Sequence, residues 1–253
     1  MKKRLHLFLF AVTLLLTACV GTTEINQQAE SAYQQQMAKY QNAGKIDRLS
    51  TTAKRVHQIF NQMRPFAQAE NRTGVPFQWQ INVIKSPELN AWAMPGGKMV
   101  FYTGIVEKLN LTNDEIATVM GHEMAHALKE HGKAQTNFDT ATGVLAQIGH
   151  VALSQVVGEE LSGYAVGITR DAFFTKPYSR SAETEADEVG LMLMAKSGFN
   201  PQAAPRLWQK MQQASGGGQG ALSALLSTHP SDEARQENLQ RLLPKAMAIY
   251  QAR

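Results

Sequence analysis

The chain has 253 residues, of which 43% are hydrophobic and 18% charged, a composition typical of a folded domain rather than of a disordered protein. Its formal net charge is +4, but residues 1–18 hold three of the 25 basic residues and none of the 21 acidic ones. The remainder is therefore nearly neutral and has no basic run. The composition gives no support for a function in nucleic-acid binding.

Residues 1–18 have the pattern of a signal peptide, with a basic head followed by an apolar run that is short for a membrane span. The run ends in Leu-Thr-Ala-Cys, which resembles the lipobox of bacterial lipoproteins. The resemblance implies cleavage before Cys19, a lipid on that residue and anchoring in a bilayer. Val20 follows in place of aspartate, which by analogy favours the outer membrane with the protein facing the periplasm. The alternative is an ordinary signal peptide or a short anchor.

Cys19 is the only cysteine, so disulfides and cysteine catalysis are excluded if it is lipidated. Residues 19–45 are polar and rich in Gln, and we interpret them as the lipidated N-terminus and a spacer, either a tether or a loosely held helix. Residues 46–253 then form one domain.

In this domain, apolar residues recur at helical spacing over 50–70, and residues 77–104 alternate as strands do around a Pro-Gly-Gly turn. Thr112 and Glu115 match a capping box that begins a helix. Residues 140–158 carry no charge, but polar side chains interrupt them, so a buried helix is favoured over a membrane span. Further helices are predicted over 181–197, over 201–214 and after the segment "STHPS".

The segment "HEMAH" lies within the helix that Thr112 begins. Residues four apart on a helix differ by about 40° of rotation, so His122 and His126 can bind one metal ion. Glu123 lies beside them and can deprotonate a water that zinc activates. The alternative is a structural pair of histidines, but the capped helix and the spacing favour a metal site.

A catalytic zinc ion usually has three protein ligands, so a third must come from elsewhere. The extended histidine motif would need a histidine at position 132, which is glycine. His131 lies about 140° around the helix from His126, and we interpret it as a helix-end histidine. Glu183 and Asp187 share one face of the helix over 181–197, so one can bind the metal while the other orients a ligand histidine. A solvated acidic face is the alternative.

"HEMAH", "ETEAD" and "NAWAMPGGKMVFYTG" together resemble the gluzincin peptidases of the HtpX, BepA, LoiP and Oma type, from about residue 48 to the last helix. The resemblance implies one zinc ion per chain, with His122, His126 and Glu183 as ligands and Glu123 as general base. It also implies that Asp187 holds a ligand histidine. The transmembrane helices and the repeat domain of some members have no counterpart here.

In this family a substrate pairs with an edge strand, and the matching residues here are Asn90, Ala91, Trp92, Ala93 and Met94. Packing of Trp92 in the core is an equal alternative. His229 and Tyr178 are candidates for stabilising the oxyanion, and His229 can instead cap the zinc and hold the enzyme inactive.

The sequence thus predicts a mainly helical α+β zincin fold with a small sheet beside the zinc helix. The expected function is a membrane-tethered metalloendopeptidase whose substrates are misfolded or misassembled cell-envelope polypeptides. The alternative is a zinc-containing lipoprotein that acts as a chaperone or scaffold with weak or gated protease activity. No pattern specifies an oligomeric state.

Overall fold

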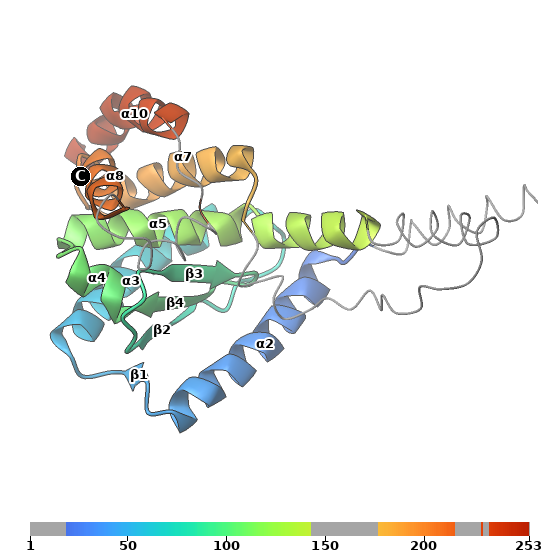
Figure 1. Cartoon of the computed structure of the whole chain (residues 1–253). Coiled ribbons are helices and arrows are strands. Elements are labelled where there is room, and N and C mark those ends of the chain that lie inside the picture. The colour runs from blue at the N-terminus through green and yellow to red at the C-terminus, as the bar shows by residue number, and fades with distance from the viewer. Residues whose placement is uncertain (1–18, 143–176, 216–228, 230–232, 253) are drawn as a thin grey trace, which may run out of the picture.

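The computed structural model describes residues 19–142, 177–215, 229 and 233–252, and it confirms the mainly helical α+β fold with a small sheet (Figure 1). The sheet has the strand order β1-β2-β4-β3. The strand β2 is parallel to β4, whereas β1 and β3 pair with their neighbours in antiparallel register. The strands are β1 (Ile46–Asp47), β2 (Gln80–Ile84), β3 (Ala91–Met94) and β4 (Lys98–Tyr102).

The predicted hairpin is the pair β3 and β4. Gly96 and Gly97 in its turn have φ angles of 79° and 83°, which side chains with a Cβ rarely adopt. A Cβ on Gly97 would also come within 2.7 Å of the Trp79 ring. The two glycines are therefore explained by the backbone conformation of the turn and by its close approach to Trp79. The strand β3 lies at the edge of the sheet.

The segment interpreted as a tether or a loosely held helix is a helix that packs on the sheet. The helix α2 (Thr22–Asn42) crosses the face of the sheet opposite α5 (Figure 1). Its buried residues are four apart, so they form one narrow apolar stripe among glutamines: Ile25, Ala29, Tyr33 and Met37. A helix with so narrow an apolar stripe has nearly the composition of a helix that is solvated on all sides. Only its packing on the sheet shows that α2 belongs to the folded domain.

The other helices lie on the second side of the sheet (Figure 1). They are α3 (Thr51–Glu70), α4 (Thr103–Lys108), α5 (Asn113–Leu128), α7 (Arg180–Lys196), α8 (Ala203–Ser215) and α10 (Glu233–Gln251). Of these, α3, α4 and α5 contact the strands, and α7, α8 and α10 pack beyond them. All of them except the short α4 match helices that the sequence predicts. The helix α5 lies between the sheet and α7 (Figure 1). It begins with the predicted capping box, in which the Thr112 side chain accepts from Glu115 N–H and Glu115 accepts from Thr112 N–H.

The helices α5 and α7 cross in direct backbone contact. Gly121 and Gly190 face each other, and a Cβ on either would lie 2.7 Å from backbone atoms of the other helix. Because His122 follows Gly121, and Glu183 lies about two turns before Gly190, this contact brings the two halves of the predicted site together.

The helical geometry breaks locally after α5. Lys129 caps the helix, Glu130 has a left-handed φ of 54°, and residues 131–142 are helical again. No helix of the described part is long and apolar enough to cross a membrane. Most of the uncharged segment 140–158 lies outside the described residues, as do residues 1–18.

Candidate metal centre

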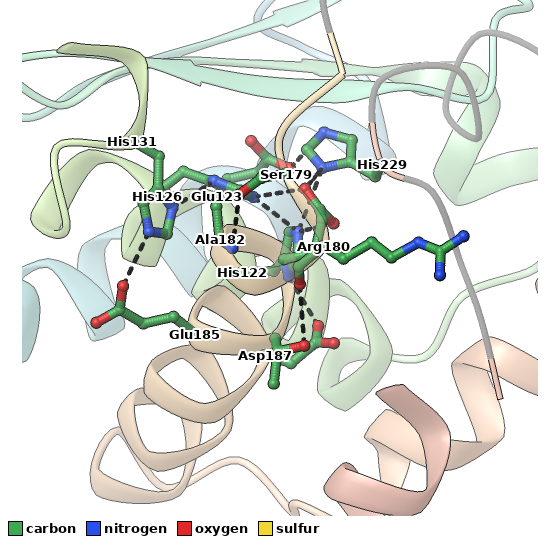
Figure 2. Close-up of polar contacts among 12 residues, drawn as sticks. His122, Glu123, His126, His131, Ser179, Arg180, Ala182, Glu185, Asp187 and His229 are labelled. Atoms are coloured by element: carbon green, nitrogen blue, oxygen red, sulfur yellow. Dashed lines mark hydrogen bonds and ion pairs between the residues drawn. The ribbon is translucent and has the colours of Figure 1, made fainter. Parts of the chain in front are cut away.

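The helices α5 and α7, together with His229 from before α10, bring four possible metal ligands together. Ligand atoms of His122, His126, Glu183 and His229 all lie within 4.8 Å of one another. Glu183 is fully buried, and His126 and His229 are nearly so. Figure 2 shows how the histidines converge from α5 and from the segment before α10.

Neighbouring ligand atoms in this cluster lie 3.0–3.3 Å apart. His122 Nε2 lies 3.0 Å from His126 Nε2 and 3.3 Å from His229 Nδ1. Glu183 Oε1 lies 3.3 Å from His126 Nε2 and 3.1 Å from His229 Nδ1. Four ligands about 2.0–2.1 Å from a tetrahedral zinc ion are separated from one another by about 3.3 Å. The donor set and its spacing therefore fit zinc.

The charge environment also favours a cation. Glu183 Oε2 lies 2.8 Å from Arg235 Nη1 and 3.4 Å from His122 Nε2. Burial opposes ionisation of Glu183, but hydrogen bonds from the three histidines hold the pKa of its carboxyl well below its usual range. Burial would lower the pKa of His122, but hydrogen bonds to Asp187 and Glu183 outweigh burial and raise it to about 10. The site thus attracts positive charge.

Burial lowers the pKa of His126 well below its ordinary value, and the charges of His122 and His229 act in the same direction. The neutral form of His126 is therefore favoured, and a neutral imidazole can bind a metal ion.

Asp187 orients His122 from α7. Its Oδ1 lies 2.9 Å from His122 Nδ1, so that ring presents Nε2 to the ligand cluster. Arg235 of α10 donates to both oxygens of Asp187, from Nε at 2.7 Å and from Nη2 at 2.8 Å. Burial opposes ionisation of Asp187, but the bonds from His122 and Arg235 lower its pKa. Arg235 is itself buried, and its guanidinium lies 4.4 Å from the centre of the Trp208 ring.

Glu123 lies on the edge-strand side of the cluster. Its carboxylate accepts a hydrogen bond from the backbone N–H of Ala93 in β3, and its Oε1 lies 3.4 Å from His229 Nε2. Burial raises the pKa of Glu123, and the nearby histidines only partly oppose this rise. A buried carboxylate with a raised pKa is suited to accept and return a proton.

The remaining predicted site residues surround this centre. The Tyr178 ring stacks on His126, with 4.1 Å between ring centroids, and burial raises the pKa of its hydroxyl. Trp92 is buried against α2 and donates to the Tyr102 hydroxyl, so its side chain packs in the core. Asn90 precedes β3 and is also buried. Cys19 is exposed and stands three residues before α2.

Two features near the site did not emerge from the sequence. Arg235 carries no motif of its own, and a single arginine in an amphipathic helix usually faces solvent. His131 is not at a free helix end, because the left-handed Glu130 returns it toward the site, where its Nδ1 lies 2.9 Å from His126 Nδ1. The rotation argument assumed that α5 continued through residue 131.

Comparison with known proteins gives the family. The model of peptidase family M48 matches residues 50–243. The chain belongs to peptidase family M48. Metalloproteases of this family use zinc, and the His/Glu cluster described above lies within the matched region.

Several curated relatives of the M48 chain are mitochondrial. The mitochondrial metalloendopeptidase OMA1 of Schizosaccharomyces pombe is 35% identical over 169 residues, which are 67% of this chain and 48% of that protein. The Arabidopsis thaliana OMA1 is 33% identical over 68% of this chain and 33% of its own length. The chain thus spans half or less of these relatives.

Metalloprotease LoiP of Escherichia coli is 24% identical over 252 residues, covering 95% of this chain and 96% of its own length. The M48 domain is therefore shared with longer and with similarly sized proteins.

Proposed function

We propose that the protein is a zinc metalloendopeptidase with His122, His126 and Glu183 as the zinc ligands and Glu123 as the general base. The observation that carries this proposal is the cluster of four ligand atoms within 4.8 Å of one another beside the buried carboxylate of Glu123. When bound, zinc supplies the Lewis acid that makes water nucleophilic at neutral pH. Glu123 accepts the proton of the attacking water and returns it to the leaving amine.

The strand β3 is the proposed binding site for substrate. It lies at the edge of the sheet, and Ala93 in it touches Glu123 through a backbone hydrogen bond. An extended peptide that pairs with residues 90–94 would therefore run past the base. Such pairing uses only the backbone of β3, so the Trp92 side chain can keep its contacts in the core. The packing of Trp92 and substrate binding by β3 are therefore compatible.

We propose that His229 restrains the site rather than stabilising the oxyanion. Its Nδ1 takes the fourth vertex of the ligand cluster, and its Nε2 lies near the base. A catalytic zinc site keeps that vertex for water or substrate. His229→Ala separates the two roles: a restraining residue predicts faster cleavage by the variant, whereas an oxyanion donor predicts slower cleavage. Tyr178, stacked on His126, would remain as the second candidate donor.

We further propose that the enzyme is lipid-anchored through Cys19 in the bacterial cell envelope and acts on misfolded or misassembled envelope proteins. The exposed Cys19 and the similarity to the E. coli metalloproteases LoiP and YcaL support this assignment. Lipid labelling of the full chain tests the anchor, because Cys19→Ser should abolish it. Equal labelling of both proteins would refute the anchor without affecting the catalytic proposal.

The alternative is a zinc-containing chaperone or scaffold. Zinc content and casein cleavage distinguish the two functions when the wild type is compared with Glu123→Gln and Glu183→Ala. A metalloendopeptidase predicts that Glu123→Gln keeps its zinc and loses cleavage, whereas Glu183→Ala loses both. Unchanged cleavage by Glu123→Gln would refute Glu123 as the base, and a wild type that binds zinc without cleaving would favour the scaffold.

A further inference from the structure

A second hydrogen-bonded arm reaches the metal cluster from the side of His126. His126 Nδ1 lies 2.9 Å from His131 Nδ1, and His131 Nε2 lies 3.1 Å from Glu185 Oε2 (Figure 2). The other oxygen of Glu185 lies 2.7 Å from Lys129 Nζ. His126 and His131 are both buried, whereas Glu185 is partly exposed at the outer end of the arm.

The proton positions along this arm follow from one requirement. His126 faces the cluster with Nε2, so its Nδ1 must carry a proton when Nε2 binds a metal. His131 Nδ1 must then accept that hydrogen bond, which leaves the His131 proton on Nε2. That proton points at the Glu185 carboxylate, which can only accept when ionised. Every donor along the chain therefore meets an acceptor.

We propose that His131 and Glu185 are positioning residues that fix the tautomer and ring orientation of the metal ligand His126. Asp187 does the same for His122, so each ligand histidine of α5 has its own partner. The proposal rests on the proposed zinc site.

The backbone conformation indicates that the arm is built into the fold. A continuous α5 would place His131 far around the helix from His126. Glu130 instead adopts a left-handed conformation that is uncommon outside glycine, and its carboxylate is bound by Thr22 Oγ1 at 2.7 Å and by Lys133 Nζ at 3.0 Å. The first residue of α2 therefore contacts the turn that returns His131 to the site.

Zinc affinity of the full chain, measured by competition with a chromogenic chelator, tests the proposal. His131→Phe keeps a ring but removes both hydrogen bonds, and we expect its zinc affinity to fall about 10- to 100-fold. His131→Asn retains an oxygen that can accept from His126 Nδ1–H, and we expect it to recover most of this loss. Glu185→Gln should lose less zinc affinity than His131→Phe. Because the Glu185 side chain is partly exposed, this substitution should not disturb folding. His57→Phe, at a half-buried histidine of α3, is the control.

Three outcomes are decisive. Weaker zinc binding by His131→Phe with recovery in His131→Asn, at similar melting temperatures of the metal-free proteins, supports the proposal. Zinc affinity of His131→Phe within threefold of the wild type overturns it, as does an equal loss in the Phe and Asn variants with no loss in Glu185→Gln. A wild type that binds no zinc would refute the proposed function as well, so the two failures are distinguishable.

Discussion

The contact between Gly121 and Gly190 predicts a large effect from one methyl group. In Gly190→Ala the new Cβ would lie 2.7 Å from Gly121 C and from His122 N, whereas carbon atoms pack at about 3.5 Å or more. Both opposing atoms belong to the α5 backbone, so no side chain can rotate away. Relief of the clash requires α5 and α7 to separate by about 0.8 Å at the crossing, which is the difference between these two distances.

That separation exceeds what the metal centre tolerates. The ligand histidines belong to α5 and Glu183 belongs to α7, and metal–ligand distances in proteins hold within about 0.2 Å. We therefore expect Gly190→Ala to bind zinc at least about tenfold more weakly, as for other disturbances of ligand support. Overpacking costs about 1–3 kcal/mol, and the gain in helix propensity from Gly to Ala offsets about 1 kcal/mol of it.

The net expectation is a metal-free protein less stable by up to about 2 kcal/mol. Urea denaturation of the metal-free protein measures the stability, and chelator competition measures the zinc affinity. Thr184→Ala is the matched control, because it raises helix propensity on α7 at a site away from the crossing. A Gly190→Ala protein with wild-type zinc affinity and an unchanged or higher urea midpoint would refute this reasoning.

Three further predictions concern the supports of the site. Arg235→Met leaves two buried carboxylates, Asp187 and Glu183, without their cation and should lower the free energy of unfolding of the metal-free protein by about 3–5 kcal/mol in urea denaturation. The pKa of Asp187 is lowered in the folded state, so its contribution to the free energy of unfolding is complete above about pH 4 and is lost as the pH falls through the folded pKa. Melting temperatures between about pH 2 and 7 should therefore depend less on pH in Asp187→Asn than in the wild type. Thr112→Ala removes the capping box and should cost about 1 kcal/mol by urea denaturation while zinc affinity stays unchanged, because the cap lies more than two turns from His122.

The sequence by itself determined the local features of this protein. The capping box at Thr112, the turn at Gly96 and Gly97, and the shared face of His122 and His126 depend only on residues a few positions apart. Helix geometry and turn conformation follow directly from such spacings. The same reasoning anticipated Glu183 and Asp187 as a pair, because they are also four residues apart on one helix.

The tertiary structure decided the features that depend on distant contacts or on a local break in regular geometry. The sequence of α2 is typical of a polar spacer, and only the structure shows that its narrow apolar stripe is covered by one face of the sheet. Arg235 gains its role only because α10 packs on α7. His131 reaches His126 because Glu130 leaves helical geometry, a conformation supported by Thr22, which lies 108 residues away in sequence. Periodicity records which side chains share a face, but it carries no information about which distant surface that face meets.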